Sequence, residues 1–426
     1  MGEQLALLGG EKTVRLPWPA YPMINHEEVS AAVRVVMSGA LSDCGRGEFI
    51  AAMEDDFSAY FGTKYALGLG SGTASIHSAL FAVGVKPGSE VLIANHNWIS
   101  PIMAVFQAGA VPVLCDVAPR SFSIDPAEIR RKVTQHTRAI IATHLWGIPA
   151  EMDGIMAAAR ELNLPVIEDV SHAHGGKYKD RYLGTIGDIG CFSLQGSKAM
   201  IAGEGGFLLT NEERYFQRAM VPGLHPSRLG EGIIMEEVKP FAAAGGMYMY
   251  RMPTIAAAIA CAQLKKLSAF NAARQANFER LTAQLSDLPF LSWPALAEGS
   301  VHGWYGTPGF YDETRAHGVP RDKFVQACQA EGMPLSGEGY TDYSQLPTLQ
   351  DMSLLGQMFS YSYPNGVAFA PIKQGTLPNN DEIRRTMLLF ALPAVELPQL
   401  MDQCAAAMRK VAANLDAVAA YEPVAV

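Results

Sequence analysis

The sequence predicts an α/β protein in which a mostly parallel mixed sheet is flanked by helices and is followed by a smaller α+β domain. Between residues 26 and 225, short apolar segments rich in β-branched residues alternate with helical segments of about ten residues, which is typical of βα units around a buried sheet. Beyond residue 290 the alternation gives way to short strands, turn clusters and helical runs. We therefore expect an extended arm at 1–25, a large domain at 26–285 and a small domain at 286–426.

Composition is that of a folded globular chain. Of the 426 residues, 49% are hydrophobic and 18% are charged, which excludes a disordered protein. The 33 Lys and Arg against 42 Asp and Glu give a net charge of −9, without the basic block that a nucleic-acid partner would require. The six cysteines are scattered, which argues against a metal site or a disulfide framework and favours a reducing, cytoplasmic compartment. No signal-peptide core or membrane-length apolar run occurs, so we expect no membrane partner.

The elements follow in order along the chain. In the arm, the prolines of RLPWPAYP remove backbone donors and favour extended backbone. We expect strands at these segments of the large domain: 65–70, 90–95, 111–117, 138–144, 165–170, 191–194 and 205–210. We expect helices at these segments: 73–83, 99–109, 126–133, 152–163, a long stretch at 254–285 with one break, and, in the small domain, 321–332 and 398–418.

A glycine turn connects the first of these strands to its helix in GLGSGTASIHSAL at 68–80. Gly72 and Thr73 would present free N–H groups at the helix N-terminus, where anions bind readily. The dinucleotide fingerprint fails because Thr73 or Ser75 stands where its third glycine is required, and no P-loop lysine follows. At this point a plain glycine turn remains the alternative.

Asp169 stands at the carboxyl end of the apolar strand PVIED, where open α/β sheets bind ligands. It could meet a cationic ring nitrogen, or it could only cap the following turn. His172 and His174 follow at a spacing that faces them apart on a strand, which argues against a metal pair. One of them could stack or form a hydrogen bond near Asp169.

Lys198 follows the strand CFSL and lies among small residues. An enclosed lysine can lose its proton and act as a nucleophile, whereas most lysines are merely solvated. Ser193 offers a hydroxyl to an anion, and Trp98 follows another strand, where an aromatic ring either covers a planar ligand or only packs.

All of these features fall at the carboxyl ends of successive predicted strands. Pyridoxal 5′-phosphate (PLP) would use every one of them. Its phosphate requires N–H groups and hydroxyls, its ring a stacking face, its pyridinium nitrogen a carboxylate and its aldehyde a lysine amine.

The motifs resemble those of the DegT/DnrJ/EryC1/StrS aminotransferases, which are fold-type I PLP enzymes. The resemblance covers most of residues 5–290 and is strongest in GSGTASIHSAL, NHNWIS, the segment from IEDV to GEGG and YRMPTIAAAIACAQL. It implies that Lys198 holds the cofactor aldehyde, Asp169 the pyridine nitrogen and His172 the ring hydroxyl. The phosphate and ring-stacking positions of the family fall on Gly72, Thr73, Ser193 and Trp98.

The resemblance also implies a homodimer with shared active sites. The segment MYMYRMP at 247–253 matches the loop that reaches the phosphate of the partner chain. Many relatives carry Asn where this chain has Met249, whose thioether cannot donate a hydrogen bond. Tyr250 or Arg251 would then supply the contact.

The activity that the resemblance implies is transfer of an amino group from L-glutamine or L-glutamate to a keto-sugar or a keto-cyclitol. The segments LALLGGEKTVRLPWPAYP and FSLQGSK look closer to the branch that acts on keto-cyclitols in antibiotic pathways. A nucleotide-linked keto-sugar and a non-catalytic PLP-fold sensor or scaffold are the alternatives. Lys198 argues against dehydratases that replace the lysine with histidine, and the scattered cysteines argue against those with an iron–sulfur cluster. The failed glycine fingerprint disfavours a nicotinamide oxidoreductase.

Loops near 225–250 and 300–345 are expected to line the acceptor pocket. The candidates there are His225, Arg228, Tyr250, His302, Trp304 and Tyr340. The candidates for the carboxylate of the amino donor are Arg251, Lys373 and Arg384.

Overall fold

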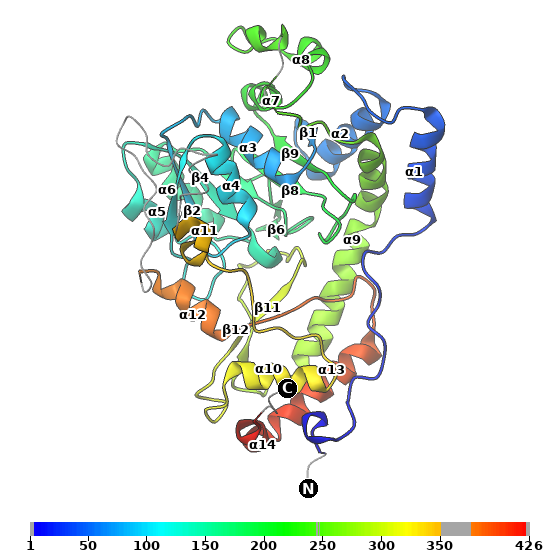
Figure 1. The fold of residues 1–426 in the computed structure, drawn as a ribbon, viewed down its shortest axis with the longest axis vertical. Helices are drawn as coiled ribbons and strands as arrows, with labels where there is room; N and C mark the ends of the chain where they lie inside the picture. The colour runs from blue at the N-terminus through cyan, green and yellow to red at the C-terminus, as the bar shows by residue number, and fades with distance from the viewer. Residues whose placement is uncertain (1–3, 244–245, 247, 351–375, 423–426) are drawn as a thin grey trace.

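The computed structural model describes residues 4–243, 246, 248–350 and 376–422 and has a seven-stranded sheet at its centre (Figure 1). The strand order is β1-β9-β8-β5-β4-β2-β3. Strand β9 is antiparallel to β1 and β8, while the pairs from β8 to β3 are parallel. The strands are β1 (Tyr65–Leu69), β2 (Glu90–Ala94), β3 (Val111–Cys115), β4 (Thr137–Thr143), β5 (Val166–Asp169), β8 (Ile189–Ser193) and β9 (Gly206–Thr210). The predicted α/β fold class with a mostly parallel mixed sheet is confirmed.

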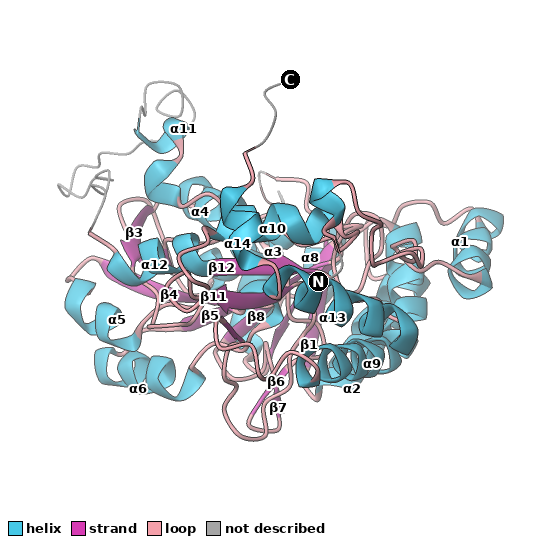
Figure 2. Cartoon of the chain, turned by 90° about the horizontal axis from the view of Figure 1, so that it is seen from below, coloured by secondary structure: helices cyan, strands magenta, loops and turns pink. Residues whose placement is uncertain are grey.

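Helices cover both faces of this sheet (Figure 2). On β2, Val91 and Ile93 point into one hydrophobic core, and Leu92 and Ala94 point into the other. The first core is closed by α3 (Gly72–Ala82), α4 (Ile99–Gln107) and α7 (Glu213–Met220). The second is closed by α2 (Glu48–Phe61), α5 (Pro126–Lys132), α6 (Met152–Leu162) and α9 (Thr254–Ala283). Burial on both faces explains why these strands are continuous apolar runs in the sequence.

The C-terminal part contains a second, three-stranded antiparallel sheet in the order β10-β11-β12 with its own hydrophobic core. Its elements are β10 (Leu291–Ser292), β11 (Thr307–Tyr311), α10 (Arg321–Ala330), β12 (Met387–Phe390), α13 (Pro398–Ala412) and α14 (Leu415–Ala420). The remaining elements are the hairpin β6 (Lys177–Tyr178) and β7 (Arg181–Tyr182), and the helices α1 (His26–Ser38), α8 (Pro226–Gly232), α11 (Pro347–Gln350) and α12 (Pro378–Thr386). The expected domain boundary at residue 285 stays a prediction.

Two predicted helices differ from the structure. The break expected within 254–285 is wrong, because α9 runs unbroken over 30 residues. The segment contains neither Pro nor Gly, the residues that commonly interrupt a helix. The single run expected at 398–418 is instead split into α13 and α14, with Ala413 and Asn414 between them.

The N-terminal arm runs past the end of α10 and along α13 before it reaches α1 (Figure 1). It contains one short 3-10 helix (Ala6–Leu8), and α1 begins after a capping box formed by Asn25 and Glu28. Near its end, the Tyr21 hydroxyl donates a hydrogen bond to the carbonyl of Lys198. Within the described ranges, no helix has the length and apolar character needed to cross a membrane.

Candidate active site

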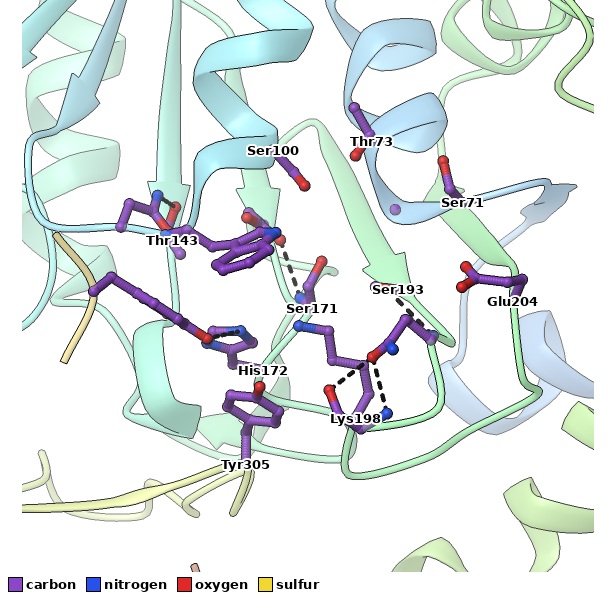
Figure 3. A pocket seen from close by; sticks show the side chains of 17 residues that line it. Ser71, Thr73, Ser100, Thr143, Ser171, His172, Ser193, Lys198, Glu204 and Tyr305 are labelled. Carbon is purple, nitrogen blue, oxygen red and sulfur yellow. Dashed lines mark hydrogen bonds between the residues drawn. The ribbon is translucent and has the colours of Figure 1, made fainter. Parts of the chain in front are cut away.

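A cavity of about 400 Å³ opens at the carboxyl edge of the large sheet (Figure 3). The loops that follow β1, β2, β5 and β8 contribute to it together with Thr143, the last residue of β4, since parallel strands end at the same edge. Its lining residues are Ser71, Gly72, Thr73, Asn97, Trp98, Ser100, Thr143, Asp169, Ser171, His172, Ser193, Gln195, Ser197, Lys198, Glu204, Tyr305 and Tyr340.

The N-terminus of α3 forms one side of the cavity. The Ser71 side chain caps this helix by accepting the N–H of Ala74 at 3.1 Å, so the N–H groups of Gly72 and Thr73 have no intrahelical partner. A Cβ on Gly72 would lie 2.7 Å from Cβ of Ser193, closer than side-chain carbons approach. Glycine therefore lets the helix end approach the Ser193 hydroxyl, and together they form a cradle for an anion.

Asp169 ends β5 and is 4% exposed. Burial raises the pKa of its carboxyl group, while the hydrogen bonds from Ser171 and the charge of Lys198 lower it. The Ser171 N–H donates to Oδ1 at 3.1 Å and fixes the carboxylate. A buried carboxylate of this kind is stabilised by a cationic partner placed in the cavity.

Lys198 is held in the loop after β8 and is also buried, at 7% exposure. Burial lowers the pKa of its amine, and the neighbouring Tyr305 and Asp169 raise it. The Nζ atom lies 4.6 Å from the centre of the Tyr305 ring. Figure 3 shows the side chain reaching from its loop into the cavity. Desolvation of this kind favours the neutral, nucleophilic form of a lysine amine.

His172 lines the cavity and packs against two aromatic rings. Its ring centre lies 3.9 Å from that of Tyr305 and 5.7 Å from that of Trp146. The Trp146 N–H donates to Nδ1 at 3.3 Å, so the proton of the neutral imidazole is on Nε2, which faces the Tyr340 hydroxyl at 3.4 Å. Burial keeps the pKa of His172 well below its ordinary value, and the charge of Lys198 lowers it further.

Trp98 covers the opposite side and is 47% exposed, unlike the other large side chains of the site. Its ring centre lies 5.2 Å from that of Tyr340, so the two rings border the mouth of the cavity. The Asn97 side chain donates to the Thr143 hydroxyl at 2.8 Å and accepts the Trp98 N–H at 2.8 Å. These bonds fix the loop that carries Trp98.

The residues of the cavity fit PLP. A helix N-terminus with hydroxyls suits the phosphate, and a buried carboxylate suits the pyridinium nitrogen. A desolvated lysine amine suits the aldehyde, and an exposed indole suits the ring face. The cavity brings together these residues that the sequence singled out: Gly72, Thr73, Trp98, Asp169, His172, Ser193 and Lys198.

The other cofactor residues expected from the sequence, Tyr250 and Arg251, do not line this cavity within one chain. The Tyr250 hydroxyl pairs with Nδ1 of His77 at 3.0 Å, and its carbonyl accepts the N–H of Gly70. Arg251 contacts the sulfur of Cys44 at 3.4 Å. The expected contact of this loop was with a partner chain, and it stays a prediction.

Of the expected acceptor residues, Tyr340 lines the cavity and the others do not. His302 is buried and stacked on Trp304, with ring centres 4.1 Å apart. Arg228 pairs with Glu54 at 2.8 Å, and His225 caps α8. For the donor carboxylate, Arg384 is paired with Asp342 at 3.3 Å, and Lys373 lies outside the described residues.

The sequence did not identify Tyr305, Glu204 or Asn97 as site residues. Tyr305 is separated from every motif of the large domain and comes from the segment before β11. The sequence signal nearest to it was Trp304, which is among the expected acceptor-pocket residues. Asn97 and Glu204 stand inside segments already recognised, NHNWIS and GEGG, so their proximity to Trp98 and Lys198 was the signal.

The comparisons with known proteins all point to aminotransferases. The family model described as the DegT/DnrJ/EryC1/StrS aminotransferase family matches residues 22–353. The chain is 31% identical over 345 residues to the L-glutamine:2-deoxy-scyllo-inosose aminotransferase of Streptoalloteichus tenebrarius, covering 79% of this chain and 81% of that protein. It is 31% identical over 343 residues to the L-glutamine:scyllo-inosose aminotransferase of Streptomyces griseus, covering 78% and 80%. The crystal structure of an aminotransferase from Psychrobacter cryohalolentis superposes with a TM-score of 0.80 at 27% identity, covering 94% and 100%.

Proposed function

Because the chain belongs to the DegT/DnrJ/EryC1/StrS aminotransferase family, we propose that it transfers the amino group of L-glutamine to a keto-cyclitol in the biosynthesis of a secondary metabolite. The chain is a PLP-dependent aminotransferase of fold-type I, as its motifs predicted. The observation that carries the proposal is that Lys198 and Asp169 are buried in one cavity with a helix N-terminus. The names of the relatives supply the chemical class of both substrates, an amino acid and a six-membered carbocyclic ketone.

The roles of the site residues follow from their surroundings. PLP, when bound, withdraws electrons and so acidifies the Cα–H of an amine attached to it. Asp169 keeps a cationic ring nitrogen protonated, which is favourable because its own carboxylate is buried. Gly72, Thr73 and Ser193 hold the phosphate by N–H and hydroxyl groups, and Trp98 covers the ring.

Lys198 moves the proton in this proposal. Once the amino donor has displaced it, its Nζ takes the proton from the donor Cα as a general base. It would then deliver that proton to the cofactor as a general acid, and hydrolysis would release the oxidised donor as its keto acid, which completes the half-reaction. His172 stays neutral and holds the ring hydroxyl through its Nε2–H. The ketone then receives the amino group by the reverse steps.

We also propose that the chain acts as a cytoplasmic homodimer with shared active sites. Helix α1 supports this, because Val29, Val33 and Met37 are 55%, 53% and 81% exposed on it, and a second copy would cover such side chains. Met249, in the loop next to Tyr250 and Arg251, is 72% exposed. In this proposal Tyr250 or Arg251 reaches the phosphate of the partner chain.

The visible spectrum of the purified protein tests the proposed function. We expect a yellow protein whose absorbance band bleaches with L-glutamine and returns when scyllo-inosose is added. Return of the band with a nucleotide-linked keto-sugar but with no cyclitol would overturn the acceptor class. Bleaching by L-glutamate but not by L-glutamine would overturn the donor. A protein that binds PLP but bleaches with no amino donor would favour the sensor or scaffold instead.

A further inference from the structure

A second, smaller cavity of about 140 Å³ adjoins the Lys198 cavity. The two cavities share Ser197 and Tyr305 as lining residues, so they lie on either side of the lysine-bearing loop. The N-terminal arm at 18–23, the segment 391–394 and Arg274 of α9 complete the smaller cavity. No residue of this cavity has a role in the proposed function, apart from the shared wall.

Arg274 is the charged group of this cavity, and it is 3% exposed. Its guanidinium contacts the Asn271 side-chain oxygen at 3.2 Å and lies 6.0 Å from the centre of the Tyr21 ring. Asn271 is held in this orientation, since its amide donates to the carbonyl of His174 at 2.8 Å. Within the described ranges, Arg274 forms no ion pair with a carboxylate. Burial lowers the pKa of Arg274, and Tyr21 raises it.

Among the described residues that line this cavity, none is a carboxylate that would compensate the charge of Arg274. Burial lowers the pKa of both His174 and His302 to about 3, with the charge of Arg274 contributing, so both rings are neutral. Trp304, another lining residue, has a buried indole N–H without a hydrogen-bond partner in the described part of the chain. The buried Nε2 atom of His302 also has no hydrogen-bond partner in the described part of the chain. A buried cation beside unused donors is typical of a site that receives an anion, because leaving such groups unpaired is costly.

Within the described part of one chain, the lining of the cofactor cavity offers no free cation for a substrate carboxylate. Lys198 is the basic side chain among its described lining residues, and it is committed to the cofactor. Arg384 is paired with Asp342, and Arg251 contacts Cys44 away from the cavity. An amino-acid donor nevertheless brings an α-carboxylate to within a few bonds of the amine that reacts at Lys198. Arg274 is the nearby described cation that has no acidic partner.

We propose that Arg274 forms the cationic wall of a carboxylate-binding subsite behind the lysine-bearing loop, and that this subsite takes the α-carboxylate of the amino-acid donor. The inference rests on the proposed function for the identity of the ligand. Arg suits this task because its planar guanidinium can donate two parallel hydrogen bonds to a carboxylate. Asn271 and Tyr21 hold the guanidinium and act as positioning residues.

The experiment compares two amines in the first half-reaction of the PLP-loaded protein. One is L-glutamine, and the other is 4-aminobutanamide, which is L-glutamine without its α-carboxylate. For Arg274→Met we expect the apparent second-order rate constant of bleaching to fall about 10- to 100-fold with L-glutamine and to change little with 4-aminobutanamide. Arg274→Lys keeps the positive charge but lacks the planar guanidinium with its two parallel donors. Its rate with L-glutamine should therefore fall by an intermediate amount. Arg280→Met, on the exposed side of the same helix, is the matched control and should leave both rates unchanged.

A parallel fall with both amines would show that Arg274 only supports the fold, and it would overturn the proposal, as would no fall with either.

A binding readout separates the proposal from the function it rests on. Glutarate, which cannot react, is titrated against the protein and followed by tryptophan fluorescence, because Trp18 and Trp304 line the cavity. We expect saturable binding that Arg274→Met weakens about 10-fold or more. If this holds while no amine bleaches the wild-type protein, the carboxylate site stands and the aminotransferase reaction fails. If it holds while the L-glutamine rate is insensitive to Arg274→Met, the site takes free carboxylates and the assignment to the donor is overturned.

Discussion

At the scale of single residues, the proposed chemistry depends on the protonation state of the Lys198 amine. Burial lowers the pKa of its amine, whereas Asp169 and Tyr305 raise it. Tyr305 is affected in turn: burial raises the pKa of its hydroxyl, but the Lys198 charge and hydrogen bonds from Tyr340 and Ser197 outweigh burial and lower it. The two groups therefore stabilise each other's charged forms, and the state of one controls the other.

This coupling predicts a change in pH dependence. Without the cofactor, Lys198 captures PLP only as a neutral amine, so the rate of capture should rise with pH through the pKa of Lys198. Tyr305→Phe removes a group that raises this pKa, so the midpoint of the rise should move to lower pH. Asp169→Asn should move it in the same direction, since the carboxylate also favours the ammonium. Stopped-flow absorbance on the apoprotein across pH measures the midpoint.

Tyr60→Phe is the control for this measurement, because the Tyr60 hydroxyl bonds to Ser268 away from the cavity. Its midpoint should equal that of the wild-type protein. A midpoint that moves to higher pH in Tyr305→Phe would show that the hydroxyl does not stabilise the ammonium of Lys198.

At the scale of secondary-structure elements, the parallel sheet explains why much of the site could be predicted from the sequence. Asp169 ends β5 and Lys198 follows β8; both strands are buried on both faces, and parallel strands end at one common edge. Tyr305 could not be placed in this way, because it comes from the segment before β11 of the other sheet. The position of that segment depends on packing between the two sheets, and no local pattern encodes it. The same limit applies to Arg274, which is a helical residue without a motif.

The helix predictions failed for a similar reason. In α9, polar residues such as Asn271 and Asn277 interrupt the apolar pattern, and the helix continues through both. Both are buried, and their amides donate to the carbonyls of His174 and Pro393. Polar side chains therefore connect α9 to the rest of the fold without interrupting the helix.

The approach of α3 to β8 gives a prediction for Gly72. Gly72→Ala would place a Cβ 2.7 Å from Cβ of Ser193 and 3.2 Å from its Cα, so the helix end must move away from the strand. Overpacking of this kind costs about 1–3 kcal/mol, which corresponds to about 5- to 150-fold weaker PLP binding if the shift falls on the phosphate cradle. Titration of the apoprotein with PLP measures the affinity.

Gly230→Ala serves as the comparison, because nothing lies within 4 Å of a Cβ at that helical position. It should bind PLP like the wild-type protein. Equal affinity in Gly72→Ala and the wild-type protein would show that the end of α3 does not hold the phosphate.

At the scale of the whole molecule, one chain supplies most of the candidate cofactor site. The loop with Met249, Tyr250 and Arg251 does not line that site, and one face of α1 leaves apolar side chains exposed. Within one chain, α3 and Ser193 line the cavity and form the proposed phosphate cradle, whereas Tyr250 and Arg251 do not line it. The exposed apolar side chains of α1 and of Met249 provide surface that a second copy would bury. A symmetric dimer in which each loop reaches the opposite site accounts for both features.

Subunit mixing tests this arrangement directly. Lys198→Ala removes the amine proposed to transfer the proton, and Arg251→Ala removes the side chain proposed to act across the interface, so each variant alone should be strongly impaired. In a mixed dimer, one site combines both defects, while the other takes Lys198 from one chain and Arg251 from its partner and is intact. Random re-pairing of equal amounts makes about half of the dimers mixed, so about a quarter of all sites should regain activity. Unfolding and refolding the variants together, followed by an assay of amino transfer, measures the recovery. If Arg251 serves its own chain, no site combines the two intact residues and recovery will be absent. If Arg251→Ala alone keeps full activity, the contact across the interface belongs to Tyr250 or is not made.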